Sequence, residues 1–206
     1  MVNAYHVIFG TYGFWLPNDP RGSWSDFVGA WELYLHGDKA TKTETRRSVA
    51  GAVHDRRARL RTKESLKYPE VRLTGIQAKF IGEAFGATAD KMACSILACS
   101  ILPQHVHLVL SRSPNDVEVV VRCLKAAATT ALLERKLHPL GKFQQPAAPP
   151  PMMWARSCWK VFLTYADEMR RAIRYVELNP VKDRKPVQQW SFVVNGNSLG
   201  DVRAAP

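Results

Sequence analysis

Two observations on the sequence predict an α+β fold. Short runs of β-branched and aromatic residues alternate with longer segments of helical periodicity. Two of the short runs follow each other directly in mid-chain, as the strands of a hairpin do. The resulting order is that of a ferredoxin-like βαββαβ antiparallel sheet with helices packed on one face. One further helix, which carries a tyrosine, is appended at the C-terminal end.

The four strands are expected where β-branched and aromatic residues gather. The first is predicted over 5–12, before a turn-rich segment. The next two are the apolar runs Cys94–Leu102 and Val106–Leu110, which flank Pro103-Gln104 and predict a pair of strands with a tight connection. Trp159–Leu163 has the composition of the fourth strand.

Three segments have helical periodicity. Thr74 is the expected N-cap of an amphipathic helix, because apolar residues recur after it at intervals of three and four. A second apolar stripe runs from Val117 to Leu132. Asp167 is expected to cap a last helix that ends at Asn179, since a proline follows it.

The chain is strongly basic. It has 206 residues, and 29 Lys and Arg against 18 Asp and Glu give a formal net charge of +11. Such an excess favours a polyanionic partner, nucleic acid before a membrane surface. No apolar run reaches the roughly 18 residues that a membrane span needs, and the N-terminus lacks the pattern of a signal peptide. We therefore expect an intracellular protein without a membrane partner.

The length fits one domain, predicted over 1–195, with 196–206 as a flexible tail. Within it, the segment 38–72 holds eleven Lys and Arg, five acidic residues and few large apolar ones. We interpret this segment as a basic insertion or loop, and its one-signed charge favours nucleic-acid binding over a merely solvated surface. The proline-rich stretch 144–151 predicts a linker or rim loop.

The strongest chemical signal is the pair His105 and His107 within an apolar run. Alternate side chains of a strand share a face, so both imidazoles point the same way and Val106 points the other. Two imidazoles so aligned can bind one metal ion together. The alternative is a pair of core histidines with ordinary hydrogen bonds, but burying two polar rings costs free energy. The pair therefore favours a metal site.

The second signal lies in the last predicted helix. Tyr175 and Asn179 are four residues apart, so they share one helical face. Taken alone, they are typical of a half-buried aromatic residue and a turn residue before a proline. Their association with the histidine pair favours a shared site.

These residues resemble a known family. His105-Val106-His107 is similar to the His-hydrophobic-His motif of HUH single-strand DNA nucleases. Tyr175 with Asn179-Pro180-Val181 resembles the tyrosine helix of single-tyrosine transposases, particularly REP-associated tyrosine transposases. The segment 12–22 is similar to the N-terminal signature of one branch of that group. The matching segments span about residues 4–192, apart from the basic segment.

The resemblance implies a metal-dependent single-stranded DNA endonuclease and strand transferase, a transposase. Tyr175 would be the nucleophile that forms a 5′-phosphotyrosine link, while His105, His107 and Asn179 would hold a divalent metal ion, Mg²⁺ or Mn²⁺. Tyr165 is the rival nucleophile, but no ligand-type residue follows it four positions on. The implied partner is single-stranded or hairpin DNA. The implied location is the bacterial cytoplasm, at the nucleoid when DNA is bound.

Basic residues around these motifs are predicted to neutralise DNA phosphates, which makes the affinity fall steeply with salt. The predicted DNA-binding residues are Arg21, Arg46, Arg47, Arg56, Arg57, Arg170, Arg171, Arg174 and Lys182.

Two other interpretations stay open at this point. A non-catalytic nucleic-acid-binding module would present aromatic residues of the sheet to bases, with structural histidines. A metal-dependent phosphodiesterase would use an activated water, with Tyr175 in a supporting role. The sequence also leaves open the target DNA, whether the gene is mobile or domesticated, and whether the protein is a monomer or a homodimer.

Overall fold

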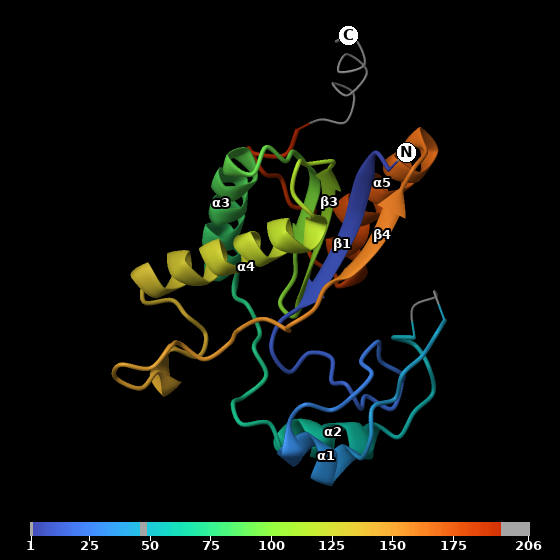
Figure 1. Cartoon of the computed structure of the whole chain (residues 1–206), viewed down its shortest axis with the longest axis vertical. Coiled ribbons are helices and arrows are strands. Elements are labelled where there is room, and N and C mark those ends of the chain that lie inside the picture. Colours follow the sequence, from blue (N-terminus) through green and yellow to red (C-terminus); the bar gives the residue numbers. More distant parts are fainter. Residues whose placement is uncertain (1, 46–48, 195–206) are drawn as a thin grey trace.

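A four-stranded antiparallel sheet forms the centre of the molecule in the computed structural model, which describes residues 2–45 and 49–194 (Figure 1). The strand order is β2-β3-β1-β4, and every neighbouring pair is antiparallel. This confirms the predicted α+β class and antiparallel sheet. The strands are β1 (Ala4–Gly10), β2 (Ile96–Ile101), β3 (His105–Ser111) and β4 (Trp159–Leu163).

Two long helices, α3 (Gly75–Lys91) and α4 (Val117–Glu134), pack on one face of the sheet and on each other. Thr74 begins α3 as predicted: its hydroxyl accepts from the backbone N–H of Gln77, whose side chain accepts in return from the backbone N–H of Thr74. Residues such as Leu108 from the sheet and Phe85 and Leu124 from the helices are fully buried in the main core between these layers.

The last helix, α5 (Ala166–Lys182), packs on the opposite face, where Ala172 and Val176 meet Val109 in a smaller cluster. Its ends differ from the prediction. The helix begins after Tyr165, not Asp167, because the carboxylate of Glu168 accepts from the backbone N–H groups of Thr164 and Tyr165. The helix also continues through Pro180 to Lys182. A proline so close to the end removes one intrahelical bond and leaves little helix to disrupt.

A separate lobe lies beyond the end of the sheet (Figure 1). It contains two short helices that pack on each other, α1 (Trp31–Gly37) and α2 (Arg56–Glu64). The basic segment 38–72 forms only part of this lobe, because α1 and the chain before it belong to it as well. The chain returns to the main core at Val71, whose N–H bonds the carbonyl of Tyr12.

The segment after α5 covers the outer edge of β2. The side-chain amide of Gln188 exchanges two hydrogen bonds of 2.8 Å with the backbone of Ile101, and Trp190 Nε1 donates to the carbonyl of Cys99. The Trp190 ring lies so close to Gly82 of α3 that a Cβ there would fall 2.4 Å from it. The segment therefore closes an edge that would otherwise expose backbone groups.

The remaining sequence predictions concern loops and the C-terminus. Residues 144–151 contain neither helix nor strand. The predicted tail, 196–206, lies outside the described residues. None of the helices in the described part of the chain combines the length and apolarity that crossing a bilayer requires.

Candidate active site

Three histidines share the sheet face that α5 covers. His105 and His107 lie on β3, and His6 lies on the neighbouring strand β1. The register pairs Ile8 with His107, so His6, two residues before Ile8, points to the same face as His107. Nε2 of His6 and Nδ1 of His107 are 3.1 Å apart, within hydrogen-bonding distance. The two rings are stacked, with centroids 5.4 Å apart.

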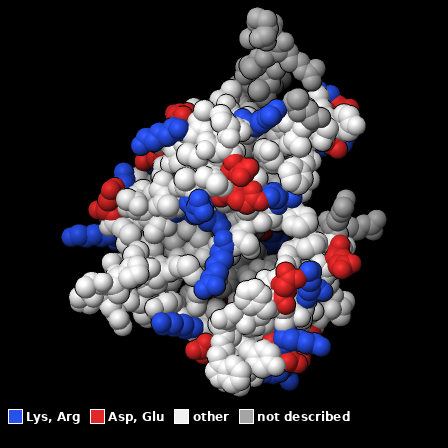
Figure 2. Space-filling model, viewed as in Figure 1, with Lys and Arg blue, Asp and Glu red and all other residues white. Residues whose placement is uncertain are grey.

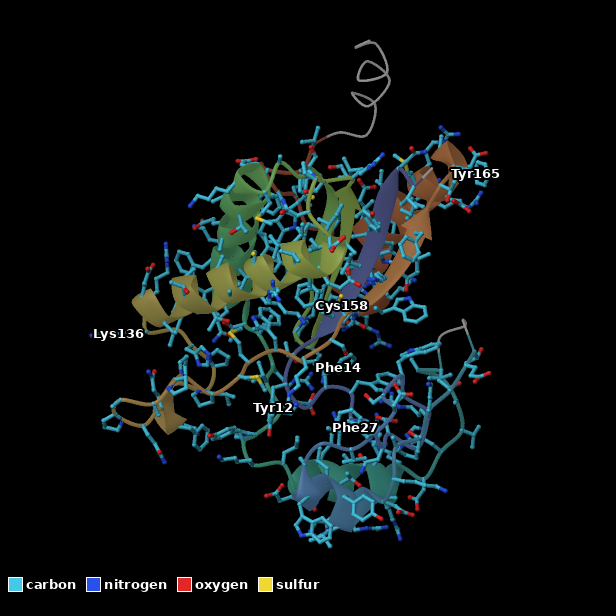
Figure 3. All side chains as sticks on the ribbon, viewed as in Figure 1. Tyr12, Phe14, Phe27, Lys136, Cys158 and Tyr165 are labelled. Atoms are coloured by element: carbon cyan, nitrogen blue, oxygen red, sulfur yellow. The ribbon has the colours of Figure 1, made fainter. Side chains whose placement is uncertain are left out.

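Helix α5 places Tyr175 against two of these histidines. The centroid of the phenol ring is 5.7 Å from that of His6 and 5.7 Å from that of His107, with edge-to-face geometry in both contacts. The residue is 42% exposed, so the phenol remains open to solvent. Tyr165, in contrast, is at the far end of α5 (Figure 3). The structure thus brings Tyr175, and not Tyr165, to the histidine pair.

A cation lies over the ring of Tyr175. Nζ of Lys182 is 3.7 Å from the centroid of the phenol ring, close enough for a cation–π contact. The two residues are seven apart, which is two turns of α5. Lys182, predicted to contact DNA, is therefore placed directly at the candidate nucleophile.

Asn179 lies one turn after Tyr175 and is 6% exposed. Its Nδ2 is buried without a hydrogen-bond partner among the described residues, and so is Nδ1 of His105. Buried polar atoms normally have partners, so each of these calls for an explanation. The nitrogen and oxygen of an asparagine amide are alike in shape, and a rotated amide would present an oxygen at the same place.

This donor set is chemically suited to a divalent metal ion. Imidazole nitrogens and an amide oxygen are ligands that Mn²⁺ accepts, and Mg²⁺ accepts the oxygen when water and phosphate complete its shell. Among the described residues, no group of three or more His, Cys, Asp or Glu is arranged to hold a metal. The predicted ligands are two histidines and one asparagine, and a set with only two such residues is not a group of that kind. The unpartnered atoms of His105 and Asn179 fit an additional ligand.

Burial keeps the histidines neutral at pH 7. It lowers the pKa of His107 to about 2, with further lowering by His105, His6 and Lys182. It lowers the pKa of His6 to about 4. The pKa of His105 is also lowered by burial, and the carboxylate of Asp183 opposes that effect. Each ring therefore keeps a lone pair, which a metal ligand needs.

The lobe forms one wall of the site. The ring of Phe14 stacks on that of His105, with centroids 5.1 Å apart and an interplanar angle of 12°. Phe14 lies where the chain leaves β1 for the lobe (Figure 3). Trp24 of the lobe likewise packs on Trp159 at the start of β4, at 4.3 Å between centroids. These contacts tie the lobe to the end of the sheet at which His105 lies.

The predicted DNA-binding arginines have different environments. Arg21 makes a bidentate ion pair with the fully buried Asp19 and lies over the ring of Trp15, and its side chain is 9% exposed. A carboxylate inside the lobe therefore already holds its guanidinium, and the contact of Arg21 with a DNA phosphate stays a prediction. Arg46 and Arg47 lie outside the described residues.

The other predicted arginines are exposed. Arg56 and Arg57 open helix α2, and Arg171 and Arg174 lie on α5. Arg170 is exposed as well, but it is paired with Asp167 one turn before it. On the face seen in Figure 2, Lys and Arg side chains are interspersed with Asp and Glu and do not form a single positive patch.

Sequence reasoning missed two residues of this site, His6 and Phe14. Strand alternation places His6 on one face of β1, but the register between β1 and β3 decides which face meets the histidine pair. That register joins strands far apart in the chain. Phe14 belongs to a turn-rich segment without periodicity, so nothing local indicates its contact with His105.

No protein-family model matches the chain, and no curated protein matches it. Solved structures similar to it include a REP-associated tyrosine transposase bound to a REP hairpin, at 14% identity over 98% of this chain and 82% of that chain, with a TM-score of 0.47. Another is a protein from Deinococcus radiodurans R1 assigned as a transposase, at 14% identity over 91% of this chain and 94% of that chain, with a TM-score of 0.42. Because both likenesses are distant, a functional assignment has to rest on the side-chain geometry.

Proposed function

We propose that this protein cuts and rejoins single-stranded DNA in the manner of a transposase, with Tyr175 as the nucleophile. The observation that carries the proposal is the contact of the Tyr175 ring with His6 and His107, at 5.7 Å to each. Residues that the resemblance marks as nucleophile and metal ligand, from distant parts of the chain, are neighbours in space. A nucleophile and the group that activates its target have to meet in this way.

In the proposed reaction, the phenol oxygen of Tyr175 attacks the phosphorus of a phosphodiester. A bond forms between that oxygen and phosphorus, and the bond from phosphorus to the 3′ oxygen breaks. The phenol proton leaves to solvent, and the departing 3′ oxygen takes up a proton as a hydroxyl. The 5′ phosphate stays on the tyrosine as an ester, so attack by a 3′ hydroxyl can rejoin DNA without a nucleotide cofactor.

The metal ion would be held by His105, His107 and Asn179, where it would act as a Lewis acid toward the phosphate. Neutral ligands leave the charge of the ion undiminished, unlike a cage of carboxylates. The ammonium group of Lys182, over the Tyr175 ring, would stabilise negative charge as it develops on the phenol oxygen.

We propose DNA with a hairpin as the substrate, as the resemblance implies. The exposed arginines Arg171 and Arg174 lie on the helix that carries Tyr175, so they are suited to bind phosphates beside the cleavage point. Arg56 and Arg57 of α2 are suited to contact DNA at the lobe. This arrangement would give an affinity that decreases as salt increases.

The test uses a labelled single-stranded hairpin, Mn²⁺ or Mg²⁺, and a denaturing gel that separates cleaved DNA from a protein–DNA adduct. Wild type and Tyr165→Phe should both cleave and form the adduct, because Tyr165 lies at the far end of α5. Tyr175→Phe should do neither. Cleavage and adduct in Tyr175→Phe would overturn the proposal. Cleavage by that variant without an adduct would indicate a phosphodiesterase that uses water.

A further inference from the structure

His6 and His107 contact each other across the neighbouring strands β1 and β3. Nε2 of His6 and Nδ1 of His107 are 3.1 Å apart, and the contact is partly buried between β1 and β3. A histidine that binds a metal ion does so as a neutral imidazole. A neutral imidazole has one nitrogen that donates and one that accepts. One of the two rings therefore donates in this contact and the other accepts.

The direction of this hydrogen bond decides what His107 can do. If His6 donates, Nδ1 of His107 accepts, and the hydrogen of His107 sits on Nε2, which then cannot bind a metal. If Nδ1 of His107 donates, its Nε2 keeps a lone pair. With Nδ1 engaged by His6, Nε2 is the ring nitrogen left for a ligand. Only the second arrangement makes His107 a metal ligand through Nε2.

We infer that His6 is a positioning residue, which accepts a hydrogen bond from Nδ1 of His107. This bond holds His107 in the tautomer whose Nε2 has a lone pair, and in the orientation that directs this lone pair away from β1. This inference rests on the proposed function, since that function requires the lone pair of Nε2 to bind a metal ion. Histidines that bind metals commonly donate their other N–H to an acceptor in this way, and loss of the acceptor weakens metal binding about 10- to 100-fold.

The packing around His6 supports the inference. The His6 ring stacks on that of His107 at an interplanar angle of 27°. It also makes an edge-to-face contact with the ring of Tyr175. Rotation of the His107 ring would therefore disturb a three-ring cluster of His6, His107 and Tyr175. Among the described residues, Nδ1 of His107 has no backbone or carboxylate acceptor. Its hydrogen-bond partner is Nε2 of His6.

The first experiment measures the tautomer directly, in the full-length, metal-free protein. Long-range ¹H–¹⁵N NMR distinguishes a ring nitrogen that bears hydrogen from one with a lone pair, and His107→Ala assigns the signals. We expect hydrogen on Nδ1 of His107 in wild type. His6→Phe keeps the ring but removes the acceptor, so the hydrogen should shift at least partly to Nε2. His6→Gln offers an amide oxygen and should restore the wild-type pattern.

His36→Phe is the control, because His36 is exposed on α1 in the lobe. It should leave the His107 signals unchanged. Hydrogen on Nε2 of His107 in wild type would overturn the inference, even if His6→Phe failed to fold. So would an unchanged tautomer in a folded His6→Phe variant.

The second experiment measures Mn²⁺ affinity without DNA, from the EPR signal of the free ion. His6→Phe should weaken binding about 10- to 100-fold, and His6→Gln should recover most of the loss. If wild type binds Mn²⁺ through His107 and His6→Phe binds equally well, the positioning role is wrong and the proposed function survives. If the tautomer depends on His6 but wild type binds no Mn²⁺, the hydrogen bond stands and the proposed metal-dependent function fails.

Discussion

At the scale of single residues, the surroundings of Tyr175 distinguish it from the other tyrosine of α5. Tyr165 is 69% exposed at the start of the helix, whereas Tyr175 contacts two histidines and a lysine. Spacing along the helix was enough to predict that Tyr175 and Asn179 share a face. The lysine over the ring was not predicted as a partner of the phenol, because the helix was expected to end at Asn179 and in the structure continues to Lys182.

Lys182 gives a prediction about rate. Lys182→Met keeps most of the aliphatic stem and removes the cation 3.7 Å from the Tyr175 ring. A group that stabilises developing charge contributes to the transition state, so adduct formation should slow by about tenfold, which corresponds to about 1.4 kcal/mol. The measurement is the single-turnover rate of adduct formation on a hairpin substrate.

The control for Lys182→Met is Lys185→Met, an exposed lysine just beyond the helix. It loses the same charge, but among the described residues the cation over the Tyr175 ring is Lys182, so this variant should slow the reaction less. Equal rates for both variants would mean that Lys182 acts through general attraction of DNA and not at the phenol.

At the scale of elements, the sequence predicted the strands and the starts of α3 and α4 well because their signals are local. Thr74 with Gln77 forms a capping box that can be seen in the sequence, and alternation placed His105 and His107 on one face. The ends of α5 were predicted less well. There, Glu168 bonds backbone groups of residues before the helix, and Pro180 sits near enough to the end to be tolerated.

The packing of the segment after α5 gives a prediction about stability. In Gly82→Ala, the new Cβ would lie 2.4 Å from the Trp190 ring, so Trp190 has to move and weakens its bond to the carbonyl of Cys99. Overpacking of this kind costs about 1–3 kcal/mol, which exceeds the gain of up to about 1 kcal/mol from replacing a helical glycine. The urea midpoint should therefore decrease.

Gly75→Ala is the matched control, because Gly75 is in the same helix and, apart from its chain neighbours and the helix backbone, no atom of the described residues lies within 4 Å of its Cβ position. This variant should be as stable as wild type or more so. If Gly82→Ala and Gly75→Ala have the same midpoint, Trp190 does not pack on α3 in solution as described.

At the scale of the whole molecule, composition predicted a basic protein but not which charged side chains pair with each other and which are exposed. The segment 38–72 is only part of a lobe that also includes α1, and Arg21 is held by Asp19 inside that lobe. Arg21 and Asp19 are near in sequence, but residues distant in sequence bury their ion pair. A count of charges cannot predict such a pair. The residues of the candidate site come from β1, β3 and α5, and only tertiary packing brings these elements together.

The histidines make the stability of the whole molecule depend on pH. His6 has a folded pKa of about 4, below its ordinary value of 6.5, so the unfolded chain binds more protons between these values. The free energy of unfolding should therefore decrease as the pH falls from 7 through 4. Each unit of pKa difference corresponds to about 1.4 kcal/mol. His107, with a pKa of about 2, acts in the same direction.

Urea denaturation of the metal-free protein at several pH values between 7 and 4 provides the measurement. His6→Gln is the matched variant, since it lacks one of the depressed titrations and should lose less stability over the same interval. A free energy of unfolding that does not change between pH 7 and 4 would show that these histidines are not buried as neutral rings.

The most direct test of the central claim is to locate the covalent link. Wild-type protein is incubated with a single-stranded hairpin and Mn²⁺, the adduct is digested with nuclease and protease, and the modified peptide is identified by mass spectrometry. The account predicts a nucleotide joined through its 5′ phosphate to the oxygen of Tyr175. Cleaved DNA with no modified peptide, or a link at Tyr165 or any other residue, would contradict it.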